Sequence, residues 1–426
     1  MKKTDVCGLF FFLAAFLFFT PSLSLSKDAK GKDLHIDGAF RHLYEVMDKG
    51  GVSFDRPRFI TSYEILSAEL TPDNKLATTC FLYDNALALM AFLARGNSED
   101  LRRAKILADA FVYAQNNDRF FTDGRLRNAY RSGAFIDGYN KKALLPGWYD
   151  KRLRQWCEDK EQVGTTTGNM AWAGLALISY FEKAGGKAYL DAALKLGEWI
   201  EKETGSDRGY TGGVVGWEPA PEKMTWRSTE HHIDLAVFFS RLFEKTGDPR
   251  WKERAAVAKR FVSAMWNEKE THFWTGTAPG ENRINTHPIP IDIQAWAIAA
   301  MPGENRYRKA LIWCEKNAYT ETDGFSGFDF DTDKDGVWFE GTAQMALAYR
   351  ITGQTDKAAG LMAALEKAQA TAPHANGKGL VAASRDGLTT GFEWKYYTRL
   401  HIGATAWLIF AQMRYNPFKT QYDDTL

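Results

Sequence analysis

The chain has 426 residues, of which 45% are hydrophobic and 25% are charged, enough for one large domain or two ordinary ones. Lys and Arg (54) nearly cancel Asp and Glu (53), so the formal net charge of +1 provides no field that would hold nucleic acid or an anionic membrane. Aromatic residues make up 14% of the chain, including 14 Trp and 17 Tyr. A helical core needs fewer such rings, so we expect some of them to face an uncharged ligand.

The first 26 residues have the order of a secretory signal peptide. Lys2 and Lys3 precede an apolar run over residues 8–19, and small residues follow up to Ser26. A membrane anchor is the alternative, but the run is shorter than the roughly 20 residues that span a bilayer. We therefore predict cleavage after Ser26, export to the periplasm or the exterior, and no stable membrane insertion after cleavage. Residues 27–426 are predicted to form a single domain.

One unit then recurs six times along the chain: a loop with Gly or Pro, a helix with an aromatic residue and a carboxylate near its start, a short turn, and a second helix. The first helices are predicted to begin near residues 83, 168, 228, 290, 337 and 403. The second helices are predicted over 101–115, 189–202, from the turn at 246–249 to 266, 307–318 and 356–369. The sixth unit has no second helix, so residues 39–48 are predicted to close a ring against it.

The two helices of each unit differ in polarity. The first helices are apolar nearly all round, and residues 171–181 contain no charge. The second helices carry charge on one face and apolar residues on the other, as in residues 101–111 and 251–261. This pattern predicts an all-α toroid of six helical hairpins, with a buried inner ring and an amphipathic outer ring. An open solenoid of hairpins is the alternative.

Six such hairpins from about Ala39 onward, with Trp and carboxylates at the inner helix starts, resemble the (α/α)6 toroids of the six-hairpin glycosidase superfamily. The resemblance lies in architecture and helix-start chemistry, so no catalytic assignment is transferred from it. It implies a carbohydrate-active enzyme, in the first place a glycoside hydrolase with a polysaccharide or oligosaccharide substrate. Polysaccharide lyases and sugar epimerases share such toroids, and a helical-repeat scaffold that binds glycan or protein without catalysis is a further alternative.

In such a ring, the loops that precede the inner helices lie at one end, so residues at the helix starts are expected to converge on a central cleft. The carboxylates at or just before these starts are Asp84, Glu230, Asp234, Asp292, Glu340 and Glu393. Each gains something from the helix dipole, but stability does not require a charge at every buried helix start. The shared position predicts a site with several carboxyl groups.

Glycoside hydrolysis needs one protonated and one ionised carboxyl group. Glu340 is the predicted acid, because the flanking Trp338 and Phe339 would raise its pKa. The predicted base is Asp84, Glu230 or Asp234. Asp292 and Glu393 are assigned to sugar hydroxyl groups.

Aromatic residues and histidines accompany these carboxylates. Tyr83, Trp172, Trp217, Trp226, Trp296, Trp338 and Trp394 are candidates for stacking on sugar rings. His231 is expected to orient a sugar hydroxyl or, with Tyr396 or Tyr397, to act as base in a lyase or epimerase, and His287 and His401 are further base candidates. A lyase would need an acidic polymer, which Arg125, Arg127 and Arg131 could bind. His231 and His232 point about 100° apart on a helix, so no metal site is predicted there.

Asp331, Asp333 and Asp335, followed by Gly336, match the first half of a calcium-binding loop. The twelfth position is Thr342, where a bidentate Glu is expected, so a polar turn without a cofactor is predicted, and calcium binding is the alternative. Cys80, Cys157 and Cys314 are widely spaced and form no metal-binding pattern. We expect them to be buried apolar residues, with one disulfide at most.

Overall fold

The computed structural model describes residues 25–49, 51, 55–69, 74–280 and 283–419. The predicted signal peptide lies almost entirely outside the described residues. Within the described ranges the chain forms thirteen α-helices, from α1 to α13, with short strands between them. None of the helices in these ranges combines the length and the apolar character needed to cross a bilayer.

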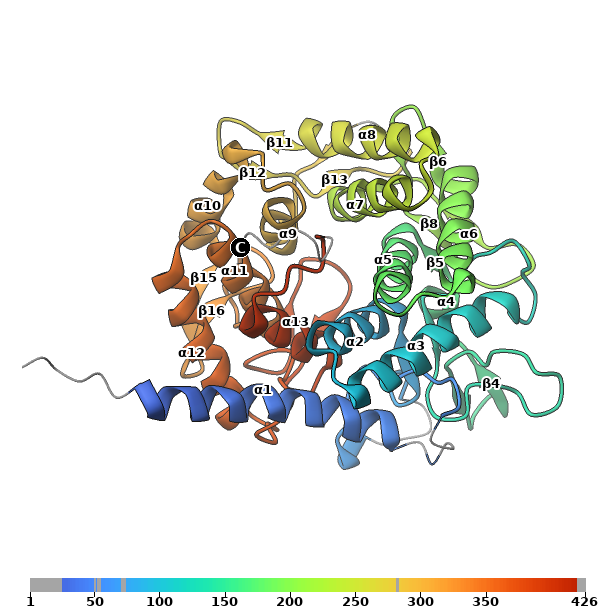
Figure 1. Ribbon diagram of the computed structural model, residues 1–426, viewed down its shortest axis with the longest axis horizontal. Coiled ribbons are helices and arrows are strands. Elements are labelled where there is room, and N and C mark those ends of the chain that lie inside the picture. Colours follow the sequence, from blue (N-terminus) through green and yellow to red (C-terminus); the bar gives the residue numbers. More distant parts are fainter. Residues whose placement is uncertain (1–24, 50, 52–54, 70–73, 281–282, 420–426) are drawn as a thin grey trace, which may run out of the picture.

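Six helices form a closed inner ring (Figure 1). They are α2 (Leu82–Arg95), α5 (Thr167–Ala184), α7 (Thr229–Thr246), α9 (Asp292–Ala300), α11 (Phe339–Ile351) and α13 (Ile402–Met413). Each contacts the next along the chain, and α13 contacts α2. This last contact distinguishes a toroid from an open solenoid, so the predicted (α/α)6 toroid is confirmed.

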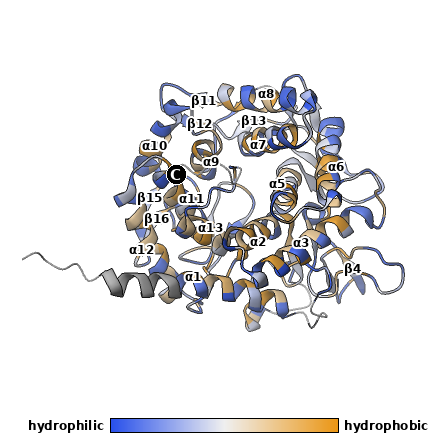
Figure 2. Cartoon of the chain, viewed as in Figure 1, coloured by the Kyte–Doolittle hydropathy of each residue, from blue (hydrophilic) through white to orange (hydrophobic). Residues whose placement is uncertain are grey.

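The outer ring covers the inner one. It consists of α3 (Ser98–Asn116), α6 (Lys187–Thr204), α8 (Pro249–Ala264), α10 (Lys309–Asn317) after the 3-10 turn η2 (Asn305–Arg308), α12 (Thr355–Thr371) and α1 (Leu25–Asp48). The short helix α4 (Lys160–Val163) and the 3-10 turn η1 (Ser67–Glu69) lie in loops. Figure 2 shows apolar residues gathered on the inner helices and polar residues on the outward faces. The difference in polarity along the sequence therefore sorts the helices into two layers.

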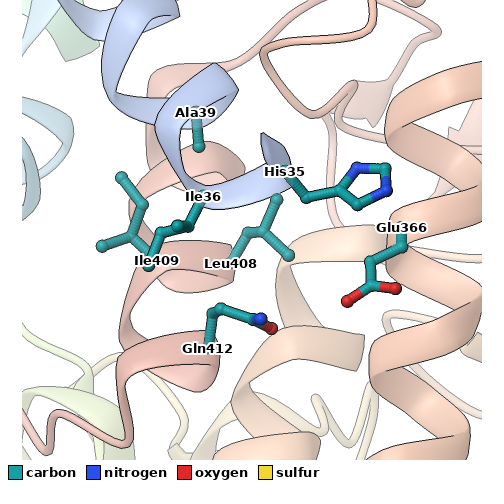
Figure 3. A pocket seen from close by; sticks show the side chains of 7 residues that line it. All are labelled: His35, Ile36, Ala39, Glu366, Leu408, Ile409 and Gln412. Carbon is teal, nitrogen blue, oxygen red and sulfur yellow. The ribbon is translucent and has the colours of Figure 1, made fainter. Parts of the chain in front are cut away.

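Helix α1 closes the ring, as predicted for residues 39–48. It packs against α13, where Ile36 and Ala39 face Leu408 and Ile409 across a small seam (Figure 3). His35 Nδ1 lies 2.9 Å from Gln369 Oε1 of α12. The N-terminal helix thus occupies the position that a second helix of the sixth hairpin would take.

Local signals set the helix ends. The Ser228 side chain accepts the N–H of His231 at the start of α7, and Asn97 and Asp100 form a reciprocal capping box at the start of α3. Gly247 ends α7 in the left-handed conformation, with φ of 69°. The boundaries predicted for the third hairpin are confirmed.

Short antiparallel pairs of strands fill the loops. The strands are β1 (Thr79–Phe81), β2 (Ala129–Arg131), β3 (Trp148–Asp150), β4 (Gln155–Cys157), β5 (Thr165–Thr166), β6 (Gly205–Ser206), β7 (Gly209–Tyr210), β8 (Gly213–Val215), β9 (Glu222–Met224), β10 (Arg227–Ser228), β11 (Trp266–Asn267), β12 (His272–Phe273), β13 (Gly276–Thr277), β14 (Ile284–Asn285), β15 (Tyr319–Thr322), β16 (Phe325–Phe328), β17 (Leu388–Thr389) and β18 (Lys395–Tyr396). Strands β1, β5 and β10 end directly before α2, α5 and α7. They fix the entry of the chain into these inner helices.

The segment after α13 folds into the ring. Asn416 Nδ2 donates to the Ala299 carbonyl at 2.8 Å, and the Phe418 ring packs against Trp172 and Trp296 with centroid distances of 5.1 and 5.7 Å. Phe418 is 4% exposed. The centre of the toroid is therefore a packed aromatic core.

The cysteines of the described residues are unpaired. Cys80 and Cys314 are buried and Cys157 is half-buried, and all three are free thiols. Burial is thus confirmed for two of them, and none of these three forms the disulfide that the sequence left open.

Candidate functional site

The starts of α2, α11 and α13 bring two carboxyl groups and a histidine together. His401, the N-cap residue of α13, lies between them: its Nε2 is 3.2 Å from Asp84 Oδ2 and its Nδ1 is 3.4 Å from Glu340 Oε2. The relative exposures of Asp84, Glu340 and His401 are 2%, 3% and 3%. Residues more than 300 positions apart in the chain thus form one buried cluster, which we call the His401 cluster.

Tyr83 and Trp407 fix the other oxygen of Glu340. The indole Nε1 of Trp407 donates to the Tyr83 hydroxyl at 2.7 Å, and the same hydroxyl lies 2.8 Å from Glu340 Oε1. Because an indole can only donate, the hydrogen of Tyr83 is free to point at Glu340. This bond stabilises the ionised form of Glu340.

The pKa of Glu340 reflects opposing effects. Burial raises it to about 7, and the negative charges of Asp84 and Asp292 add to this increase, whereas His401 and the Tyr83 hydroxyl oppose it. The sequence attributed a raised pKa to Trp338 and Phe339. Burial is confirmed as the main cause, but the polar partners from α2 and α13 were not predicted.

A second group of carboxyl groups comes from α7 and α9. Burial, Asp292 and Glu340 raise the pKa of Glu230 to about 8, and burial raises that of Asp292 to about 7. Asp234 is fully buried one helical turn below Glu230, and among the described residues neither of its oxygens has a hydrogen-bond partner. Burial, Glu230 and Asp292 raise its pKa well above the usual value. At neutral pH Glu230 and Asp234 therefore retain protons, whereas Asp292 is protonated in only part of the molecules.

The two groups act on each other electrostatically, because the charge of Asp292 raises the pKa of both Glu230 and Glu340. Five of the six predicted carboxylates, Asp84, Glu230, Asp234, Asp292 and Glu340, are thus brought to one end of the inner ring. Glu230 is half-buried, whereas the other four are at most 7% exposed. Glu230 is the member of the set that is most open to solvent.

Glu393 lies apart from this set. It is exposed on the β17–β18 hairpin, and its charge acts on Glu161. Its predicted neighbour Trp394 is 50% exposed and stacks on Phe392 with a centroid distance of 4.7 Å. The helix-start rule fails for Glu393 because eight residues separate it from α13, and Glu393 lies in the exposed turn of the β17–β18 hairpin.

The predicted aromatic residues fall into three groups. Tyr83, Trp172 and Trp296 pack with Trp407 beneath the carboxyl groups, with Trp172 and Trp296 at a centroid distance of 5.2 Å. Trp338, two residues before Glu340 in the chain, stacks on Tyr396 at 5.6 Å. Trp217 is 49% exposed in the β8–β9 loop and has no contact with the carboxyl groups that would support its assignment.

His231 lies at the start of α7 with its ring close to Trp226, at a centroid distance of 5.4 Å. Burial lowers its pKa to about 4, so the ring is neutral at physiological pH. Its Nδ1 is buried and has no partner among the described residues. His232 points elsewhere, with Nδ1 2.6 Å from the Ser228 carbonyl and Nε2 accepting the Tyr210 N–H, as its position one residue along the helix predicts.

Two of the three arginines considered for an acidic sugar are already paired. Arg125 binds Asp123 at 2.6 Å, and Arg127 binds Asp118 at 2.6 Å while being 1% exposed. Arg131 lies over the Trp156 ring, in a surface pocket of about 310 Å³ formed by the loops around β3 and β4. The expectation that Arg125 and Arg127 would bind substrate is therefore wrong, because carboxylates of the same loops neutralise them.

The acidic turn before α11 differs from the predicted calcium loop. The carboxylates of Asp329, Asp331 and Asp333 lie within 4.8 Å of one another. Asp335 instead accepts the Thr389 N–H at 3.0 Å. Burial and a hydrogen bond with Asp333 raise the pKa of Asp329 to about 8. The turn contains an oxygen-rich group of the kind that calcium prefers, but with Asp329 in the place predicted for Asp335.

The sequence analysis missed Tyr63 and Trp407 and gave His401 only a secondary place. Trp407 is the sixth residue of α13, as Trp172 is the sixth of α5, and Trp296 is the fifth of α9. This repeated position would have identified Trp407. Tyr63 stacks on His401 at 4.2 Å with an interplanar angle of 3°, and it comes from a loop without a comparable signal.

No protein-family model matches the sequence, and no curated protein matches it. Solved structures do. The chain is similar to a D-mannose isomerase, with 11% identity, a TM-score of 0.62 and coverage of 91% of this chain and 97% of that one. A cellobiose 2-epimerase from Bacillus thermoamylovorans is 12% identical, with a TM-score of 0.62 and coverage of 90% of this chain and 99% of that one. A glycoside hydrolase family 76 mannosidase from Bacteroides thetaiotaomicron is 13% identical, with a TM-score of 0.55 and coverage of 90% of this chain and 98% of that one.

At these identities the likeness establishes the fold, and it agrees with the ring of contacts among the inner helices. The shape predicted from the resemblance to six-hairpin glycosidases is confirmed. The named neighbours carry out hydrolysis, epimerisation and isomerisation, so the fold alone does not select one reaction.

Proposed function

We propose that the protein is a carbohydrate-active enzyme, and in the first place a glycoside hydrolase, in which Glu230 is the general acid and Glu340 the carboxylate that activates water or attacks carbon. The supporting observation is the unequal environment of these two groups. Glu340 accepts a hydrogen bond from Tyr83 and lies beside His401, and both contacts favour its ionised form. Glu230 lies near Asp292 and Glu340, whose charges favour its protonated form.

This assignment reverses the expectation that Glu340 is the acid. Burial raises the pKa of both groups, to about 7 for Glu340 and about 8 for Glu230, but only Glu340 has partners, His401 and Tyr83, that oppose this increase. Glu230 is also the more exposed of the two, as a donor to a leaving oxygen must be. Asp84 and Asp234 are assigned no direct contact with the sugar, because one faces His401 and the other is fully buried.

The substrate is proposed to be an uncharged glycan. The site gathers five carboxyl groups, and Arg125 and Arg127 are already neutralised by carboxylates of their own loops. An acidic polymer would meet like charge at the site. The stacked rings of Phe392 and Trp394, which are 37% and 50% exposed, provide a flat apolar surface for a sugar ring. The leader over residues 1–26 supports action outside the cytoplasm, in the periplasm or after secretion.

Epimerisation or isomerisation is the second candidate, and one observation favours it. Neutral His231 has a buried Nδ1 without a partner among the described residues. A nitrogen of this kind can take the proton from a substrate carbon atom that is adjacent to a carbonyl group. The neighbours with TM-scores of 0.62 include an isomerase and an epimerase.

One assay separates these reactions. Wild type, Glu230→Gln, Glu340→Gln and His231→Gln are incubated with neutral and acidic glycans, and new reducing ends, unsaturated products and changed sugar configuration are measured. We expect reducing ends from neutral glycans, lost in the two Gln variants of the carboxyl groups and retained in Glu393→Gln, an exposed carboxylate control. Configurational change without chain cleavage, lost in His231→Gln, would establish the second candidate instead. Unsaturated products from an acidic glycan would show a lyase.

A further inference from the structure

One proton of the His401 cluster can be bound at either of two atoms, Glu340 Oε2 or His401 Nδ1. Nδ1 of His401 accepts the N–H of Ala404 at 3.3 Å, which requires its lone pair and places the ring hydrogen on Nε2, toward Asp84 Oδ2. In this tautomer the hydrogen between Nδ1 and Glu340 Oε2, which are 3.4 Å apart, belongs to Glu340. If it moves to Nδ1, His401 becomes an imidazolium between two carboxylates.

The surroundings hold these three groups in place. Tyr63 lies parallel to the imidazole at 4.2 Å, which prevents the ring from tilting. A Cβ at Gly403 would lie 2.7 Å from Asp84 Oδ1 and 2.8 Å from His401 Cε1, so only glycine allows Asp84 to approach. All three groups are at least 97% buried. Both ring nitrogens of His401 face partners within the protein, so His401 acts through Glu340 and not by direct contact with a substrate.

We propose that Asp84 and His401 are positioning residues that take up the proton of Glu340 Oε2 at His401 Nδ1, so that Glu340 is ionised again within the same turnover. This inference rests on the proposed hydrolysis. Glu340 takes a proton from the attacking water, Glu230 gives its proton to the leaving oxygen, and the hydroxide of the water joins the sugar carbon. The proton on Glu340 then passes to His401, where Asp84 stabilises the imidazolium. After the products leave, His401 releases this proton through Glu340 to water and Glu230 takes a proton from water, which restores the starting state.

Every titratable group around this cluster bears on its charge. The helices contribute Asp84 and Tyr83 from α2, Glu340 from α11 and Asp292 from α9. Cys80 comes from β1 and Tyr396 from β18, and Tyr63 and Arg399 come from loop segments. The tyrosines have pKa values raised well above the usual one by burial, so they remain neutral. Burial lowers the pKa of His401, but the charges of Asp84 and Glu340 outweigh it and raise the value overall. Asp292 acts only through its charge on Glu340.

The test follows the ring nitrogens of His401 by ¹⁵N NMR of the histidine-labelled protein as a function of pH, with His401→Gln to assign the signal. We expect the hydrogen on Nε2 at high pH and a second one on Nδ1 as the pH falls. In Asp84→Asn and Glu340→Gln, protonation of Nδ1 should require a pH lower by at least one unit. Asp292→Asn, which removes a nearby charge without touching the ring, should shift it less. Equal titrations in wild type and Glu340→Gln would overturn the proposal.

Kinetics give a second, separate readout. Asp84→Asn and Gly403→Ala, which removes no titratable group, are each expected to lower kcat at least tenfold and to shift its pH profile, with KM within about twofold. A merely structural role would lower the melting temperature without a pH shift, and that result would also overturn the proposal. The NMR result judges proton sharing even if the glycan assay shows that the reaction is not hydrolysis, so the two failures can be told apart.

Discussion

Replacing Tyr83 with Phe removes a single hydroxyl that stands between Trp407 and Glu340. That hydroxyl donates to Glu340 Oε1 at 2.8 Å, and a hydrogen bond to a charged group contributes about 1.5–3 kcal/mol. Since 1.36 kcal/mol corresponds to one pKa unit, the pKa of Glu340 should rise by roughly one to two units. The rising limb of the kcat profile near pH 7 then moves toward the falling limb near pH 8 set by Glu230. At pH 6 we expect kcat to fall roughly 10- to 100-fold.

The measurement is kcat against pH on a glycan that wild type cleaves, together with thermal unfolding. Tyr349→Phe is the matched control: Tyr349 is a buried tyrosine of α11, and its hydroxyl donates to Glu315 at 2.7 Å, outside the site. Both variants lose a hydrogen bond to a carboxylate, so both should be destabilised by about 1–3 kcal/mol. Only Tyr83→Phe should change the pH profile. An unchanged profile in Tyr83→Phe, or equal changes in both variants, would refute the role given to Tyr83.

Three further predictions concern stability. Phe418→Ala should lower the unfolding free energy by about 3–5 kcal/mol by opening a cavity against the tryptophans, measured by urea unfolding, whereas Phe120→Ala, at a side chain 52% exposed, should change it little. Because burial raises the pKa values of Asp292 and Glu340 to about 7, the folded protein binds more protons than the unfolded one from about pH 4.5 to 7. As far as these two groups determine it, the melting temperature should be highest below pH 4.5 and should fall as the pH rises through 7. Millimolar calcium at pH 7.5 should raise the melting temperature of wild type but not of Asp329→Asn, and equal effects in both would show that this turn holds no calcium.

Some residues of the site could be predicted from the sequence and others could not. The position at an inner helix start placed Asp84, Asp292 and Glu340 correctly, because the start of each inner helix lies at the same end of the ring. The same rule placed Glu393 wrongly, since a hairpin intervenes before α13. Arg125 and Arg127 were candidates for binding an acidic sugar, but Asp123 and Asp118 in the same loop neutralise them. Such pairing of side chains across a turn leaves no periodic pattern in the sequence that would have predicted it.

The sequence by itself determined the architecture. Alternation of apolar and amphipathic helices sorts them into an inner and an outer ring, because burying apolar area drives this separation whatever the details of packing. The sequence also predicted that the unpaired N-terminal helix closes the circle, and α1 does pack against α13.

Only the tertiary structure decided which groups meet and which protons they hold. The residues that meet are between 1 and more than 300 positions apart in the chain: Tyr83, Asp84, Glu340 and His401. Differences of a few tenths of an ångström in the distances between their polar atoms decide which of them are hydrogen-bonded. The pKa values of buried carboxyl groups depend on desolvation and on the nearest charges, and both arise only when the ring closes. The distinction between the proposed acid, Glu230, and the proposed base, Glu340, therefore comes from packing and not from residue type.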